Sequence, residues 1–277
     1  MSLSRGGVLR RRRESNSRVD YRGRLHMGMC TIEESKQMQN SVLPILSLTF
    51  DDGFRCQFEE ALPILNQYGI PATFFLIANQ QPTHENHQNE WLKIDWCEKD
   101  IAMLKTIVQS GHEIGSHSVT HDPVQMPRQP EFEAVESKRL IEKWIGTDIS
   151  SFCYPYYASV SYLEGAVRKA GYRQARFGRR SSYYHLSAPL GFNIDCRQAS
   201  NQDKVQDWIK PSHWHVLTFH GIGGKDSGWE PVSVDHFAVM MADLAEMQGK
   251  NDVEIVTFKE GANRFRRDIS TASSPSV

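Results

Sequence analysis

The feature that most restricts the fold of this chain is a repeated alternation of strand-like and helix-like segments. Short apolar runs rich in β-branched residues predict strands at 45–50, 72–77, 112–115 and 216–219, with others near Phe152, Tyr172 and Phe192 and at 254–256. Helical spacing of apolar residues predicts helices at 58–68, 98–109, 131–145, 160–170 and 234–247. Strands that alternate with helices favour a mainly parallel sheet of the α/β class, and both an open doubly wound sheet and a closed barrel fit this pattern.

Polar residues directly follow several of these predicted strands. Asp51 and Asp52 follow the first strand, His117 follows the third, and His220 follows the strand at 216–219. In both parallel architectures, ligands bind at the carboxyl ends of the strands. We therefore expect these side chains to meet at one edge of the sheet and to form an active site there.

The positive charge of the chain is concentrated at its start. Eight arginines lie among the first 24 residues against Glu14 and Asp20, although the formal net charge of the whole chain is only −1. We predict a basic, disordered segment at 1–40, a catalytic domain at 41–268 and a C-terminal tail at 269–277. The balanced net charge and the lack of aromatic residues interleaved with these arginines predict no nucleic-acid partner.

No apolar run indicates an export signal or a membrane anchor. A secretory signal needs about 7 to 15 apolar residues after its positive charges, whereas Glu14, Ser15 and Asn16 follow the arginines here. No stretch approaches the roughly 18 apolar residues of a membrane span. The five cysteines are odd in number and contain no Cys-x-x-Cys pair, which indicates reduced thiols. We therefore expect a cytoplasmic protein.

The spacing of His117 and His121 is typical of metal ligands. On a helical turn, residues at i and i+4 lie on one face, about 5 to 6 Å apart at Cβ, which suits two imidazoles on one ion. A solvated pair of histidines on an exposed turn is the alternative interpretation. The position of the pair directly after a predicted strand favours metal binding.

Asp51 and Asp52 are adjacent carboxylates at the end of an apolar strand. Like charges so close together oppose joint ionisation, and a bound cation removes that conflict. Alternatively, one of the two caps the segment that follows. Two histidines and one carboxylate form a common hydrolytic metal set that leaves positions for water and substrate. The second aspartate would then be available as a base.

The sequences Thr49-Phe50-Asp51-Asp52-Gly53 and His117-Ser118-Val119-Thr120-His121 resemble the first two motifs of the polysaccharide deacetylase family, also called the NodB-like carbohydrate esterases of family 4. The resemblance extends from about Leu46 to Phe265. It implies a distorted (β/α) barrel of the NodB-homology type with mainly parallel strands. It also implies a metal-dependent hydrolase of carbon–nitrogen bonds, a deacetylase that removes N- or O-linked acetyl groups from a carbohydrate.

This resemblance also implies which residues bind the metal and which acts as the base. Asp52, His117 and His121 would hold one divalent transition metal ion, which is zinc in most members, with nickel, cobalt or iron as alternatives. Asp51 would be the general base that takes a proton from metal-activated water.

Three further residues are candidates for completing this chemistry. The backbone N–H of Tyr156, which follows the third-motif proline, is expected to hold the oxyanion. His220 resembles the fifth-motif histidine and is our candidate for the acid that protonates the leaving amine. Asp195 is predicted to lie near His220 and to favour its charged form.

The third motif of this chain departs from the family pattern. Many members have an arginine there that orients the base, whereas this chain has Cys153 in the arginine's place, within a Tyr-Pro-Tyr variant of the motif. Arg176 is a candidate replacement, although a surface arginine is our preferred interpretation of it. Trp229, in the glycine-rich stretch after His220, is a candidate rim contact for a sugar ring.

Two alternative functions fit the same residues. A hydrolase of a small non-sugar amide, similar to the family's relatives of allantoinase type, fits a protein without an export signal. A carbohydrate-binding protein with weakened catalysis fits the missing third-motif arginine. The expected partners are an acetylated carbohydrate or a small amide, and the sequence predicts no particular oligomeric state.

Overall fold

The strands of the protein form one sheet that is parallel almost throughout. The computed structural model describes residues 42–79, 93–157, 160–178, 183–185 and 192–264. The central strands lie in the order β5 (Gln174–Arg176), β4 (Ser151–Cys153), β3 (Glu113–Ser116), β2 (Ala72–Leu76), β1 (Ile45–Phe50) and β8 (His213–Phe219), and all of these neighbours pair in parallel. The mainly parallel sheet predicted from the sequence is thereby confirmed.

Three short strands lie beside this row of strands. They are β6 (Tyr183–His185), antiparallel to β8, and β7 (Arg197–Gln198) and β9 (Glu254–Ile255), parallel to β8 and β1 respectively. The chain before β7 also bonds to β5, because the N–H of Ile194 donates to Ala175 at 3.0 Å and its carbonyl accepts from Phe177 at 2.7 Å. The sheet therefore curls back on itself, as the predicted distorted (β/α) barrel requires.

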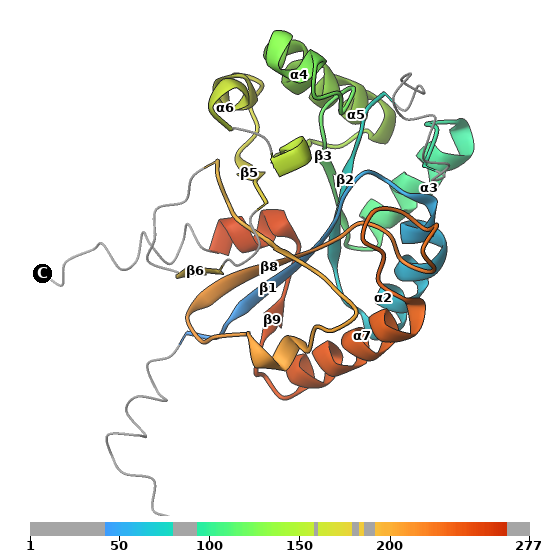
Figure 1. Ribbon diagram of the computed structural model, residues 1–277, viewed down its shortest axis with the longest axis vertical. Coiled ribbons are helices and arrows are strands. Elements are labelled where there is room, and N and C mark those ends of the chain that lie inside the picture. Colours follow the sequence, from blue (N-terminus) through green and yellow to red (C-terminus); the bar gives the residue numbers. More distant parts are fainter. Residues whose placement is uncertain (1–41, 80–92, 158–159, 179–182, 186–191, 265–277) are drawn as a thin grey trace, which may run out of the picture. The chain divides into compact units, whose positions relative to one another are not determined.

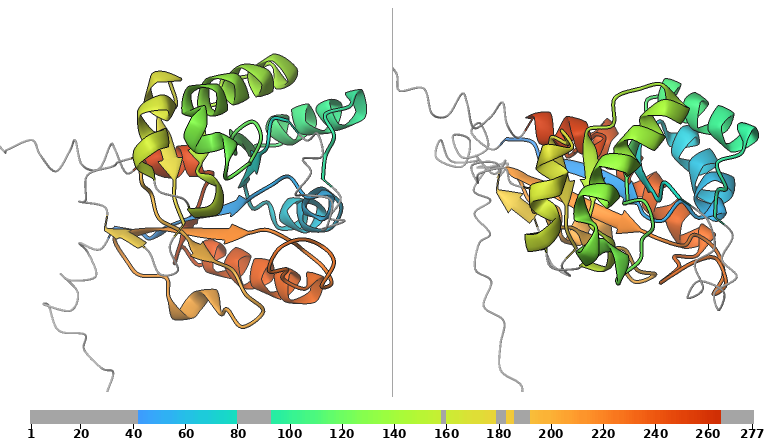
Figure 2. Two further views of the ribbon diagram at one scale, coloured as in Figure 1. Left: turned by 45° about the horizontal axis from the view of Figure 1, so that its top comes forward. Right: turned by 90° about the horizontal axis from the view of Figure 1, so that it is seen from above.

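Helices cover the outside of the sheet. Figure 1 shows them around the strands, and the further views in Figure 2 agree. Their bounds are α2 (Leu62–Tyr68), α3 (Glu98–Gln109), α4 (Gln125–Arg128), α5 (Ser137–Ile145), α6 (Val160–Lys169) and α7 (Val234–Gly249). Residues 258–264 are also helical, and short 3-10 turns occur at Pro155–Tyr157 and Val205–Asp207. None of the helices in the described part of the chain is both long and apolar enough to cross a membrane.

The observed elements differ from the predicted ones mainly at their bounds. The strand expected near Tyr172 begins at Gln174, and the one expected near Phe192 is only a single β-bridge at Ile194. The helix predicted at 58–68 starts with a π-helical turn at Gln57–Ala61, and the helix predicted at 131–145 starts with one at Phe132–Glu136. The spacing of apolar residues does not reveal such turns. The segments 1–40 and 269–277 lie outside the described residues, so the domain bounds stay a prediction.

Apolar side chains fill both sides of the sheet, because successive residues of a strand point to opposite faces. On the helix side, Phe50 of β1 packs against Phe237 of α7, with ring centroids 6.0 Å apart. On the inner side, Phe75 and Trp214 belong to a separate buried cluster. Residue 115 must be a glycine beside Phe75, because a Cβ there would lie 2.5 Å from its ring. The curled sheet is therefore packed with side chains rather than hollow.

Candidate active site and metal centre

Two adjacent aspartates leave the end of β1 in different conformations. The N–H of Asp51 still donates to Phe219 of β8, at 3.0 Å, so Asp51 continues the strand pairing. Asp52 then adopts a positive φ of 72°, which turns the chain away from the sheet. Both carboxylates are buried. Asp52 lies near the imidazole of His117, whereas Asp51 pairs with the guanidinium of Arg176.

Asp52 and the two histidines of the second motif bring three ligand atoms together. Oδ1 of Asp52 lies 3.6 Å from Nε2 of His117 and 3.4 Å from Nε2 of His121. The three ligand atoms all lie within 4.8 Å of one another. One carboxylate and two imidazoles are a donor set that fits a single divalent transition metal ion. The structure therefore brings together the three residues predicted as ligands.

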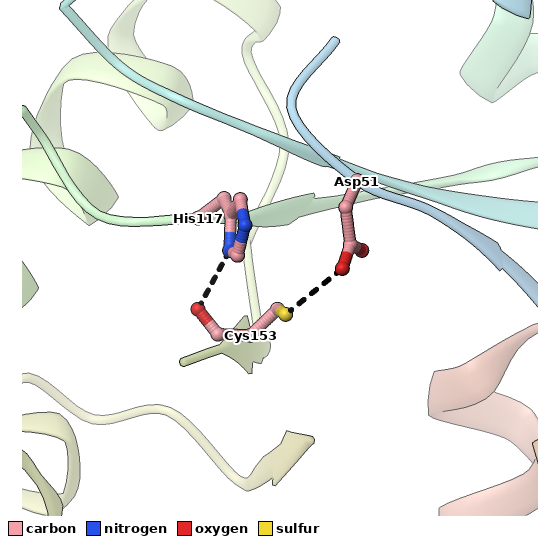
Figure 3. A group of neighbouring side chains, drawn as sticks. All are labelled: Asp51, His117 and Cys153. Carbon is pink, nitrogen blue, oxygen red and sulfur yellow. Dashed lines mark hydrogen bonds between the residues drawn. The ribbon is translucent and has the colours of Figure 1, made fainter. Parts of the chain in front are cut away.

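The ring of His117 is held in one orientation by the chain around it. Its backbone N–H donates to Leu76 at 2.8 Å, and its Nδ1 lies 2.9 Å from the carbonyl oxygen of Cys153 (Figure 3). Because a carbonyl only accepts hydrogen bonds, Nδ1 carries the ring proton and Nε2 presents its lone pair to Asp52. This tautomer can bind a metal ion through Nε2.

His121 is neutral in this structure at neutral pH. Burial lowers the pKa of His121 to about 3, although the nearby charge of Asp52 opposes this shift. A neutral imidazole has a lone pair available for a metal ion. The ring also lies beside that of His117, with ring centroids 4.8 Å apart.

The segment that carries the two histidines is a loop, and the predicted helical turn is wrong. Ser118 and His121 have positive φ values of 71° and 52°, which no α-helix contains. The loop is held by Glu133, a fully buried residue whose Oε2 accepts the backbone N–H groups of Val119 at 2.8 Å and Thr120 at 2.9 Å. The sequence gives no local signal for Glu133, which is separated from the loop by more than ten residues.

Arg176 lies inside the protein, which corrects our interpretation of it as a surface residue. Its side chain is fully buried, and Nη2 donates to Oδ1 of Asp51. Burial by itself raises the pKa of Asp51, but the charge of Arg176 above all, together with its hydrogen bond, opposes this effect, and the pKa lies below its usual value. Asp51 is therefore ionised at neutral pH, as a general base must be.

Asp51, His117 and Cys153 form a second group whose ligand atoms lie within 4.8 Å of one another. The thiol of Cys153 lies 3.6 Å from Oδ2 of Asp51 (Figure 3). Burial raises the pKa of this thiol well above its usual value, so it stays protonated. The guanidinium of Arg176 contacts both Asp51 and Cys153, and its charge disfavours a cation between them.

His220 follows β8 and lies beside the predicted base. Its Nε2 is 3.7 Å from Oδ2 of Asp51. Burial lowers the pKa of His220, and the negative charges of Asp51 and Asp52 oppose that shift. Asp51 is thus a carboxylate beside His220, and Oδ1 of Asp195, the carboxylate that we predicted there, accepts the N–H of Cys196 at 2.9 Å. Any catalytic role of Asp195 stays a prediction.

Two exposed aromatic residues flank the buried groups. Tyr156 has a positive φ of 56°, and its hydroxyl donates to the carbonyl of His121 at 3.0 Å. Trp229 lies edge-on to His220 with ring centroids 4.6 Å apart. The loop that brings Trp229 back beside His220 needs a glycine at 221, because a Cβ there would lie 2.8 Å from the backbone of Ser227. The proposed contact of the Tyr156 N–H with an oxyanion stays a prediction.

Comparison with known proteins shows the family of the chain. Residues 40–175 match the polysaccharide deacetylase family. The chain belongs to this family. It is 27% identical over 104 residues to the peptidoglycan-N-acetylglucosamine deacetylase of Bacillus cereus, with 36% of this chain and 41% of that protein covered. It is 29% identical over 101 residues to the chitooligosaccharide deacetylase of Sinorhizobium fredii, with 35% and 40% covered.

The polysaccharide deacetylase fold extends over most of the chain. A family 4 acetyl xylan esterase from Clostridium thermocellum, solved in complex with a cobalt ion, superimposes with a TM-score of 0.54 at 19% identity. The match covers 79% of this chain and 91% of that one. At this identity the likeness shows the fold, and it confirms the predicted distorted (β/α) barrel. The chain spans less than half the length of the curated relatives that it matches.

Proposed function

We propose that this polysaccharide deacetylase family member is a metal-dependent hydrolase that removes N- or O-linked acetyl groups from a carbohydrate. The observation that carries the proposal is the convergence of Asp52, His117 and His121 beside an ionised, buried Asp51. A carboxylate base next to a metal-binding set is an arrangement that can hydrolyse an amide or ester.

Asp52, His117 and His121 would hold one divalent ion, and zinc is the ion that we expect. The fit rests on the converging donor atoms and on the His117 tautomer, which leaves Nε2 available. When bound, such an ion lowers the pKa of water and polarises an acyl carbonyl. Nickel, cobalt and iron are the alternatives, because all of them accept imidazole and carboxylate ligands.

The chain's own residues would then move the protons. Arg176 engages Oδ1 of Asp51, so Oδ2 is the oxygen available to take a proton from the attacking water. The imidazolium form of His220, with Nε2 at 3.7 Å from Oδ2, would donate a proton to the departing amine or alcohol and return to neutral imidazole. The backbone N–H of Tyr156 would donate to the oxyanion that forms on the acetyl carbonyl.

The alternative of a carbohydrate-binding protein with weakened catalysis has lost its main support. It was motivated by the missing third-motif arginine, and Arg176 supplies a buried guanidinium beside Asp51. The alternative of a small non-sugar amide as substrate remains open to experiment, because no described contact selects between a polymer and a small molecule.

The proposal is tested by offering acetylated chitooligosaccharides, acetylated xylan and allantoin to the zinc-loaded protein. We expect release of acetate from at least one of the two carbohydrates and no hydrolysis of allantoin. Hydrolysis of allantoin alone would replace the proposal with the small-amide function. Release of acetate that persists after complete removal of metal by a chelator would contradict the metal dependence.

A further inference from the structure

Arg176 lies in register with the cysteine that occupies the position of the third-motif arginine. In the parallel pairing of β4 and β5, Cys153 and Arg176 are directly opposed. Opposed residues of paired strands project from the same face of a sheet. The two side chains therefore point into the same part of the curled sheet, from neighbouring strands.

The surroundings of Arg176 are shaped to hold its guanidinium. Nη1 lies 2.8 Å from Sγ of Cys196, and Nη2 lies 3.0 Å from Sγ of Cys153. The guanidinium carbon also lies 5.2 Å from the centre of the Phe75 ring, which stabilises a cation. Both cysteines are free, and their small side chains leave room that a larger residue at 153 would occupy.

Among the described residues, Asp51 is the carboxylate that pairs with this buried cation. Nη2 donates to Oδ1 of Asp51, and the side chains are 1% and 4% exposed. The second oxygen of the carboxylate, Oδ2, faces the thiol of Cys153 at 3.6 Å and Nε2 of His220 at 3.7 Å. Arg176 thus fixes the rotation of the Asp51 carboxylate, with Oδ1 bound to the guanidinium and Oδ2 facing His220.

We propose that Arg176 is the positioning residue for the base Asp51 and that β5 supplies here the guanidinium that position 153 of β4 lacks. Cys153 is part of this arrangement, because a thiol is small enough to let Arg176 reach across from the neighbouring strand. The inference rests on the proposed function, since it assigns Arg176 a role in the reaction of that same site.

The first test measures steady-state kinetics on the acetylated carbohydrate that the wild-type protein hydrolyses fastest. We expect Arg176→Met to lower kcat by about 100-fold with little change in KM, because a misplaced base slows the chemical step. Arg176→Lys should recover part of this loss, since an ammonium keeps the charge but not the planar shape. Arg168→Met, at an exposed arginine of α6, is the matched control and should leave both constants unchanged.

The second variant moves the arginine back to β4. In Cys153→Arg/Arg176→Met, the guanidinium starts from the opposed position of the same strand pair, and we expect kcat at least about tenfold above that of Arg176→Met. A merely structural role of Arg176 predicts no such recovery. If Arg176→Met does not fold, Arg176→Lys and the relocated variant carry the test, because both keep a cation beside Asp51.

The third test needs no substrate, so it separates this inference from the proposed function. Urea unfolding of Arg176→Lys, Asp51→Asn and the double variant gives the coupling between the two side chains. We expect strong coupling, because each single change disturbs the buried pair of Arg176 and Asp51, and the second change then has less of that contact left to remove. Additive effects, or an unchanged kcat in Arg176→Met, would overturn the inference. A wild-type protein that releases no acetate would instead overturn the proposed function.

Discussion

The Nδ1 atom of His117 lies 2.9 Å from the carbonyl oxygen of Cys153, and this contact links the second and third motifs of the chain. It fixes both the rotation of the ring and its tautomer, so that Nε2 faces Asp52 at 3.6 Å. A backbone carbonyl supplies this contact, so it does not depend on which side chain stands at 153. The departure of the third motif from the family pattern therefore leaves the proposed metal centre intact.

Replacement of His117 by alanine should remove the metal ion. Two ligands remain in His117→Ala, so we expect its affinity for a divalent ion to fall by about tenfold or more. After dialysis, the variant should retain less than about one ion per ten chains. Metal analysis of the purified variant measures this. His213→Ala, at a histidine whose Nδ1 contacts Pro211 outside this site, is the control and should keep the wild-type content.

Glu133 should matter for metal binding although it touches no ligand atom. The carboxylate of Glu133 accepts three hydrogen bonds, from the N–H groups of Val119 and Thr120 and from the Thr120 hydroxyl. In Glu133→Gln, one of the two carboxylate oxygens is replaced by an amide NH₂ group, which donates, so the loop before His121 is held less firmly. We expect zinc affinity to fall by about 10- to 100-fold, as measured by competition with a chelating dye. Glu131→Gln, at an exposed glutamate nearby, should bind zinc like the wild type. Equal affinities of the two variants would contradict the role given to Glu133.

Trp229 should affect substrate binding more than the chemical step. The residue is 38% exposed and its ring lies against His220, in a position suited to stack on a sugar ring. We expect Trp229→Leu to raise KM by about tenfold with a smaller change in kcat. Trp144→Leu, in α5, removes a ring that packs against Trp96 and serves as a control for the loss of a tryptophan. A Trp229→Leu variant with wild-type KM would contradict the prediction.

Glu113 should make the stability of the protein depend on pH. Burial raises the pKa of Glu113, although hydrogen bonds from Ser151, Lys259 and Thr73 oppose this shift. A raised pKa in the folded state means that protonation of Glu113 stabilises the folded protein. This stabilisation is fully present below the unfolded pKa of 4.5. This contribution is lost as the pH rises through the folded pKa.

Urea unfolding of the wild type and of Glu113→Gln measures this effect, because the other titrating groups cancel in the difference. We expect the free energy of unfolding of the wild type, relative to the variant, to increase as the pH falls from about 7 to about 4.5, by about 1.4 kcal/mol for each unit of the shift. Glu60→Gln, at an exposed glutamate, should show no comparable trend. A wild-type advantage that grows toward high pH would contradict the direction of the shift.

The candidate metal ligands could be predicted because each belongs to a short motif at the end of a predicted strand. Asp52 lies two residues after the end of β1, and His117 follows β3 directly, so the parallel sheet alone brings them to one edge. The backbone between His117 and His121 could not be predicted in the same way. Its shape depends on Glu133, whereas the i, i+4 spacing by itself indicates a helical turn.

Arg176 shows why other parts of the site could not be predicted. It is separated from Asp51 by 125 positions in the sequence, and an arginine at the end of a short strand looks like a surface residue. Only the pairing of β4 with β5, and the closing contact of β5 with Ile194, place it inside the sheet.

The most direct test of the account compares wild-type protein with Asp51→Asn at equal metal content. Acetate release from the best acetylated carbohydrate and bound zinc are measured on the same samples. Because we propose Asp51 as the base and not as a ligand, we expect the variant to keep its zinc and to lose acetate release by about 100- to 10,000-fold. Wild-type rates in a zinc-loaded Asp51→Asn protein would contradict the central claim.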